Sequence, residues 1–110
     1  MKVEEHGHTI IIKDTQGDAS GFLHKVTQEY KTFAGHNLIL DLSHDKSIDM
    51  NNITAFGPLA KKHKAAKKSF VLVAPELDYN SVPAFIVIVP YLLEAHDIIE
   101  MDEIERDLGF

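Results

Sequence analysis

The sequence predicts one α/β domain, because short apolar runs alternate with longer stretches in which apolar residues recur at helical spacing. Residues 38–42 form the clearest run and are nearly all apolar, as in a central strand that is covered on both faces. A second run at residues 69–75 follows a helical pattern, and such a crossover makes the two strands parallel. The length of 110 residues suits one compact domain, residues 1–110.

The chain begins with the pattern of a β-hairpin. Residues 2–5 and 9–13 are two short extended candidates. Gly7 lies between them and can take the positive φ that a tight turn requires.

A first helix is predicted after a polar turn, with its start near Gly21 and Asp18 or Ser20 as its cap. Gly35 is expected to end this helix in the left-handed conformation. The apolar stripe of the helix consists of Phe22, Val26, Tyr30 and Phe33. Core packing is a better interpretation of these aromatic residues than a ligand site.

A second helix is predicted over residues 50–67, with Asp49 as its N-cap. Its apolar face consists of Ile53, Phe56 and Ala60, with His63 as a further candidate. Gly57-Pro58 lies inside this stretch, so the helix is either kinked there or begins at Pro58.

The last third of the chain predicts a strand and a helix. Residues 76–83 are short for a crossover, although one helical turn would fit. An apolar run at residues 85–89, ended by Pro90, predicts a third buried strand. A final helix is expected over residues 91–108, with a break at Met101-Asp102 as one option. Its inward residues are expected to be Leu92, Ala95, Ile99, Ile104 and Leu108.

Composition excludes several classes of function. The absence of cysteine excludes disulfides, thiolate zinc sites and cysteine nucleophiles. The first five residues are too acidic for a signal peptide, and no apolar run is as long as a membrane span, so we expect a cytoplasmic protein without membrane contact.

Charge is distributed unevenly along the chain. The net charge of −6 argues against general nucleic-acid binding, although the lysine cluster alone could hold a phosphate-bearing partner. Lysines cluster at residues 61–68, whereas carboxylates crowd residues 94–107, so two copies could pair through these helices as a homodimer. A solvated helix face remains the simpler interpretation of the lysines.

Three polar groups could carry chemistry. His6 and His8 could share a metal ion, but two histidines need further ligands, so incidental surface histidines are favoured. Asp41, His44, Asp45 and Asp49 follow one strand end and could perform acid–base chemistry or bind a divalent ion. Helix capping and a solvated loop explain them more simply. The run from Ser43 to Asp45 is no triad, because adjacent residues rarely converge.

The order of elements resembles the STAS family, which includes the anti-sigma factor antagonists. The resemblance rests on Leu40-Asp41-Leu42-Ser43, Ser47-Ile48-Asp49, residues 68–73 and Leu92-Leu93-Glu94-Ala95. It implies a mixed sheet of four to five strands with helices mainly on one face. It also implies reversible binding to a regulatory kinase or an anti-sigma-like protein.

One position departs from the STAS pattern. The family carries a phosphorylatable serine or threonine just after the aspartate of the loop before the second helix, where this chain has Met50. Asn51 and Asn52 also lack a hydroxyl group, and neither Ser47 nor Thr54 matches the motif. Phosphorylation at this point would add about two negative charges to an interface, and the sequence lacks the acceptor for it.

The chain is also similar to short single-domain proteins that carry the name ribonuclease Z. That activity needs a His-x-His-x-Asp-His run to hold two zinc ions. Here His6-Gly7-His8 is followed by Thr9-Ile10-Ile11, so the residues do not support the activity.

Together these patterns predict a non-enzymatic domain that binds another protein and needs no cofactor or metal. The predicted contact surface comprises the loop and helix residues His44, Asp45, Ser47, Asp49, Met50, Asn51, Asn52, Lys61 and Lys64. The alternative is a small-ligand binder or weak hydrolase that uses a strand-end pocket around Asp41, His44 and Asp49.

Overall fold

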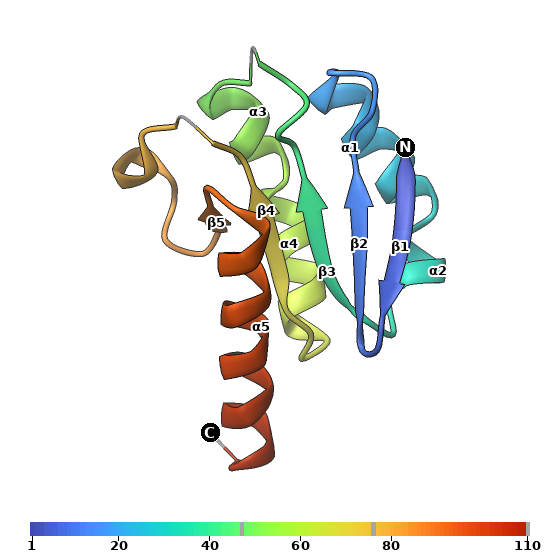
Figure 1. Cartoon of the computed structure of the whole chain (residues 1–110), viewed down its shortest axis with the longest axis vertical. Helices are drawn as coiled ribbons and strands as arrows, with labels where there is room; N and C mark the ends of the chain where they lie inside the picture. The colour runs from blue at the N-terminus through green and yellow to red at the C-terminus, as the bar shows by residue number, and fades with distance from the viewer. Residues whose placement is uncertain (47, 76, 110) are drawn as a thin grey trace.

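A five-stranded mixed sheet forms the centre of the protein in the computed structural model, which describes residues 1–46, 48–75 and 77–109 (Figure 1). Its strands lie in chain order: β1 Lys2–His6, β2 Thr9–Lys13, β3 Asn37–Asp41, β4 Phe70–Val73 and β5 Val87–Val89. β1 and β2 are antiparallel, and every later neighbour pair is parallel. The predicted hairpin, the central strand and the parallel crossover are therefore confirmed.

The hairpin turn contains Gly7 at φ 60°, as the sequence predicted. The register pairs Lys2 with Lys13 and His6 with Thr9. β3 then aligns with β2 from Asn37 opposite Thr9.

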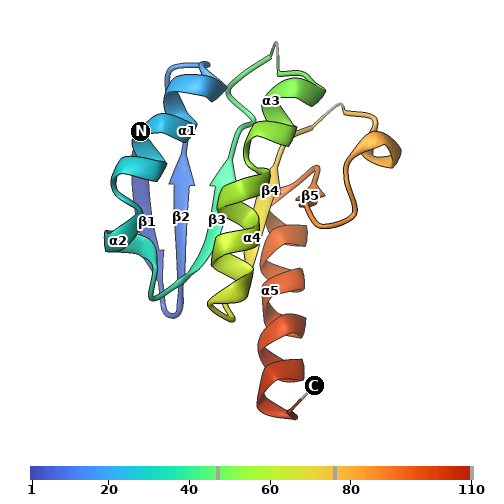
Figure 2. The same cartoon turned by 180° about the vertical axis from the view of Figure 1, so that it is seen from behind.

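Four helices cover one face of the sheet: α1 Ala19–Gln28, α2 Tyr30–Phe33, α3 Met50–Ala55 and α4 Gly57–Ala65. The long helix α5 Leu92–Asp107 lies on the other face over β3, β4 and β5, so helices lie mainly on one face (Figures 1 and 2). Alternating residues of each central strand therefore enter different cores. Leu38 and Leu40 of β3 pack with the four-helix layer, whereas Ile39 packs with α5.

Both long helical stretches before β4 are divided into two helices. Glu29 separates α1 from α2, and Phe56 separates α3 from α4. Pro58 lies in the first turn of α4, where its missing N–H group costs no helical hydrogen bond. The helical stretch is thus interrupted at Phe56, and a second helix begins at Gly57-Pro58.

The predicted role of Gly35 is wrong. Gly35 does not have a positive φ, and the turn after α2 is closed by a hydrogen bond from the His36 N–H group to the Phe33 carbonyl. Among the residues that the structure describes, the non-glycine residue with positive φ is Lys67, at 63°, just after α4.

The strand predicted over residues 85–89 is shorter and less buried than expected. β5 contains only Val87–Val89, and Phe85 lies outside it with 38% of its surface exposed. As an edge strand, β5 has a neighbour on one side only. The segment before it contains one turn of 3₁₀ helix, η1 Tyr79–Ser81, which fits the single turn expected there.

The final helix is continuous through Met101-Asp102, so no break occurs there. Ala95 and Ile99 are buried as predicted, but Ile104 and Leu108 are 53% and 65% exposed. The inward direction predicted for these two residues is therefore wrong. The cause is length: sixteen helical residues span about 24 Å, whereas the four residues of β4 span about 13 Å. The last turns of α5 consequently extend past the sheet (Figure 1).

Candidate functional site

The predicted contact residues of the loop and of the start of α3 lie at the carboxyl edge of the sheet, where β2, β3 and β4 end side by side. The structure does not bring Lys61 and Lys64 to this edge, because both lie on α4 and Lys64 lines a groove at the opposite edge. The loop after β3 and the start of α3 form this edge beside the start of α1 (Figure 2). Ser47 lies outside the described residues, and the other predicted loop residues can be placed. We call residues 43–46 together with 48–52 the carboxyl-edge loop.

Asp45 holds the carboxyl-edge loop to α1. Its side chain is 7% exposed and accepts a hydrogen bond of 3.2 Å from the Ala19 N–H group. Asp14 at the end of β2 is similarly buried and accepts hydrogen bonds of 3.0 Å from the N–H groups of Gln16 and Asp18. Buried carboxylates at these positions satisfy backbone donors that would otherwise lose their hydrogen bonds.

Asp49 and Asn52 form a reciprocal capping box at the start of α3. Each side chain accepts a hydrogen bond of 3.0 Å from the backbone N–H group of the other residue. This arrangement confirms Asp49 as the N-cap and fixes the direction in which the loop enters the helix. Met50 is partly buried against the main core, whereas Asn51 is exposed.

The four groups considered for acid–base chemistry are not brought into one constellation. Asp41 accepts hydrogen bonds from the backbone and hydroxyl groups of Ser43, while Asp45 binds the start of α1 and Asp49 caps α3. His44 is exposed. Among the described residues, no group of three or more His, Asp or Glu side chains is placed to hold a metal ion.

A shallow hollow of about 280 Å³ lies at this edge. The residues that line it are all polar or charged and comprise Lys13, Asp14, Thr15, Asp41, Ser43, His44 and Lys46. Asp49 does not line it. The apolar pocket that would favour a small-ligand binder or hydrolase at Asp41, His44 and Asp49 is therefore not formed by these residues.

The lysines of α4 contact aromatic residues of neighbouring segments. The Lys61 ammonium group lies 4.3 Å from the centre of the Phe85 ring, and Lys64 donates a 2.9 Å hydrogen bond to the Phe85 carbonyl. Lys62 lies 4.6 Å from the centre of the Tyr30 ring. Lys61 and Lys64 thus hold the segment before β5 against α4, in addition to presenting charge to solvent.

Phe85 packs against α4, a contact within the protein that the sequence did not indicate. Its ring lies against Gly57, where an added Cβ atom would approach the ring to 3.1 Å. The Gly57-Pro58 pair therefore has a packing role besides interrupting the helix. A glycine in a helical pattern is the available signal for such a close approach, but it does not name the partner.

His63 joins three parts of the four-helix layer. It is fully buried on α4, and its imidazole lies 2.7 Å from both the Tyr30 hydroxyl group and the His36 carbonyl oxygen. The carbonyl can only accept, so Nε2 carries the proton and Nδ1 accepts from Tyr30. Burial lowers the pKa of His63, the hydrogen bond to the His36 carbonyl raises it, and the charge of Lys68 lowers it further. Burial also raises the pKa of Tyr30.

The exposed part of the carboxyl edge is small and polar. His44, Lys46 and Asn51 project from the described part of the carboxyl-edge loop, on a backbone held by the contacts of Asp41, Asp45, Asp49 and Asn52. The arrangement presents these exposed polar side chains on a backbone that is held by hydrogen bonds. Such a surface suits recognition of another molecule.

Comparison with known proteins identifies the fold class. No family model matches the chain, and no curated protein matches it. Among solved structures, a similar fold occurs in a Thermotoga maritima protein provisionally assigned as an anti-sigma factor antagonist. The TM-score is 0.59 and the identity 18%, over 90% of this chain and 93% of the other. The chain therefore has a STAS-like α/β fold, as its sequence pattern indicated.

No helix within the described residues has the length and apolar character needed to cross a membrane.

Proposed function

We propose that this protein is a non-enzymatic regulatory domain that binds another protein through the carboxyl-edge loop and the adjoining start of α3. The observation that carries the proposal is that the carboxylates at this edge are engaged in hydrogen bonds within the protein. Asp41 at the end of β3 and Asp45 and Asp49 in the loop accept hydrogen bonds from neighbouring groups, which holds a polar surface in place. The fold that it shares with an assigned anti-sigma factor antagonist supports a regulatory role.

Binding by this surface is proposed to be independent of phosphorylation at the start of α3. Met50 stands where the STAS pattern has a hydroxyl residue, and its side chain packs partly into the core. Thr54, one turn later, donates a 2.8 Å hydrogen bond to the Met50 carbonyl. A partner would therefore recognise a surface that phosphorylation does not change. The concentrations of this protein and its partner would then set the amount of complex.

The proposed partner is a regulatory protein, of the kinase or anti-sigma-like class, in the cytoplasm. Polar contacts at the edge of an interface are screened by salt more strongly than buried contacts. Affinity capture of the tagged protein from its own cell lysate, at low and at high salt, would test this. We expect the tagged protein to retain one protein in preference to others, and to retain less of it at high salt.

The exposed residues provide a sharper test than the capping residues. Changing His44, Lys46 and Asn51 together to alanine leaves the capping box intact and is expected to reduce capture of that protein at least tenfold, since interface energy concentrates in a few residues. The matched control changes Gln28, Lys31 and Thr32, which are exposed around α2, and should leave capture unchanged.

Equal capture by both triple variants would contradict the surface assignment. Recovery of nothing except further copies of this chain would contradict a heterologous partner and indicate self-association. Thermal unfolding of both variants should match that of the wild type, which separates loss of binding from loss of fold.

A further inference from the structure

The opposite edge of the sheet has a different character from the proposed protein-binding edge. Two adjoining grooves of about 560 and 380 Å³ lie where β3 and β4 begin, against the last turns of α5. Lys67, Lys68 and Arg106 line both grooves. Positive charge therefore gathers at this edge although the whole chain has a net charge of −6.

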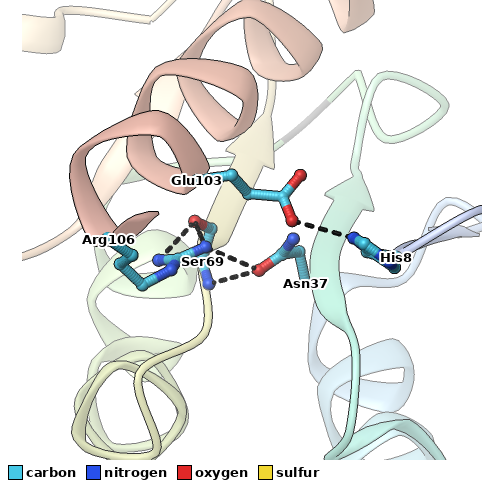
Figure 3. Close-up of polar contacts among 5 residues, drawn as sticks. All are labelled: His8, Asn37, Ser69, Glu103 and Arg106. Atoms are coloured by element: carbon cyan, nitrogen blue, oxygen red, sulfur yellow. Dashed lines mark hydrogen bonds and ion pairs between the residues drawn. The ribbon is translucent and has the colours of Figure 1, made fainter. Parts of the chain in front are cut away.

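Arg106 is held over the larger groove by two buried polar residues (Figure 3). Its guanidinium group donates to the Ser69 hydroxyl at 3.3 Å and to the Asn37 side-chain oxygen at 3.2 Å. Asn37 and Ser69 are each 2% exposed, and the Ser69 N–H group donates to the same Asn37 oxygen at 2.9 Å. These contacts position the guanidinium group but do not neutralise it.

Three carboxylates of α5 lie near this edge, and two of them have partners, whereas Asp107 lines only the smaller groove. Glu103 turns toward His8, with 3.1 Å between the carboxylate and the imidazole (Figure 3). Asp102 accepts a 2.7 Å hydrogen bond from the Ser69 hydroxyl group and is the one carboxylate among the described lining of the larger groove. Within the described part of the chain, Lys67, Lys68 and Arg106 form no ion pair. Their charge is thus available to an anion.

Lys67 occupies a position that favours glycine. The Lys67 N–H group donates to the Lys64 carbonyl at 2.9 Å and the Lys68 N–H group to the His63 carbonyl at 3.3 Å, which is the hydrogen-bond pattern of a Schellman motif. The residue at this point adopts the left-handed conformation, here φ 63°, and glycine does so without steric cost. A lysine in its place gives up backbone stability while adding a cation to both grooves.

The larger groove also has an apolar wall. Phe70, Val87 and Ile98 line it beside the cations. A ligand that fits would place a charged head group near Lys67, Lys68 and Arg106 and an apolar body against this wall.

We propose that the groove between the start of β4 and the last turns of α5 binds a small organic anion, with a phosphate or carboxylate head group and an apolar body. This site lies at the edge opposite the carboxyl-edge loop and does not depend on the proposed protein interaction. The two head-group chemistries can be distinguished by probes of each kind.

Titration with AMP, with octanoate and with uncharged adenosine, followed by amide NMR shifts, tests the proposal. Saturable binding of AMP or octanoate is expected, with shifts concentrated at Phe70, Ile98 and Gly109. Adenosine should bind more weakly than AMP, and high salt should weaken the binding of either anion. The stronger of the two anions identifies the head group.

The Lys67→Gly variant separates binding from stability. It removes one cation and places glycine at the left-handed position, so its thermal midpoint should be no lower than that of the wild type. Affinity for the anion should fall about tenfold, as for loss of one charge-assisted contact. Lys31→Gln removes a lysine of α2, outside both grooves, and should leave affinity unchanged.

Three results would overturn the proposal. One is the absence of saturable shifts with both anions. Another is binding whose shifts lie at the carboxyl edge. The last is an equal change in affinity for the anion in the Lys67→Gly and Lys31→Gln variants.

Discussion

His63 is the residue at which burial and titration are most closely linked. A neutral imidazole makes two hydrogen bonds of 2.7 Å inside the four-helix layer, to Tyr30 and to the His36 carbonyl. Protonation would place a charge in a fully buried position near Lys68. The geometry therefore stabilises the neutral form.

Stability is expected to fall as the pH drops below 6.5, the ordinary pKa of histidine. Because the pKa of His63 is lowered in the folded state, the unfolded chain takes up a proton first, and each step toward acid favours unfolding. Above that pH both states are neutral at His63, and its contribution is constant. Urea unfolding of the wild type and of His63→Gln across pH 5 to 8 would check this. An equally steep fall in both proteins would contradict the assignment to His63.

Removing the hydroxyl group of Tyr30 should destabilise the protein. Tyr30→Phe leaves the buried Nδ1 atom of His63 without its donor, which typically costs about 1–3 kcal/mol. Tyr91 is 65% exposed, so Tyr91→Phe is the matched control and should change the free energy of unfolding by less than about 0.5 kcal/mol. Chemical denaturation measures both, and equal values would show that the Tyr30–His63 bond contributes nothing.

At the scale of elements, the start of α3 depends on one reciprocal pair. Asp49→Ala removes the side-chain acceptor for the Asn52 N–H group and should cost about 1 kcal/mol in unfolding free energy. Asn51→Ala, inside the same turn but exposed and outside the box, is the control and should be nearly neutral. A neutral Asp49→Ala, measured by urea unfolding, would contradict the capping role.

Helix α5 has a buried half and an overhanging half. Ile99 is 3% exposed against β3 and β4, so Ile99→Ala should cost about 2–4 kcal/mol. Ile104 is 53% exposed, and Ile104→Ala should cost less than about 0.5 kcal/mol. Thermal unfolding of the two variants distinguishes them. Similar losses of stability would mean that the Ile104 side chain contributes to packing as much as the buried Ile99.

The comparison of these elements explains what sequence patterns can predict. Apolar runs and helical spacing correctly located the hairpin, β3, β4 and the capped start of α3, because local pattern and burial agree there. The same spacing misplaced Ile104 and Leu108, because periodicity continues along a helix after its supporting sheet has ended. Propensity predicted a left-handed Gly35 after the first helical stretch, which the structure does not show, and it did not indicate the left-handed Lys67 after α4.

The candidate site was predictable only in part. The loop after β3 could be located as an exposed polar edge, since carboxyl ends of parallel strands meet there. The separate uses of Asp41, Asp45 and Asp49 depend on contacts with Ser43, α1 and Asn52 that sequence spacing does not define. The grooves beside Arg106 join residues that are distant along the chain, so no local pattern indicates them.

At the scale of the whole molecule, the sheet separates two edges that differ in the side chains they present. Its carboxyl edge presents the loop proposed for protein recognition, and its amino edge presents the cationic grooves. Helices α1 to α4 cover one face of the sheet, and α5 covers β3, β4 and β5 on the other face, where β1 stays largely exposed (Figures 1 and 2). The two edges and the exposed half of α5 are therefore among the surfaces left for interaction.

Amide hydrogen exchange of the protein, alone and with the partner recovered by capture, tests the central claim most directly. The account predicts slower exchange in the complex at residues 43–46 and 48–55, with the amino edge and α5 unchanged. Protection confined to α5 or to the amino edge, with the carboxyl-edge loop exchanging as in the free protein, would contradict it.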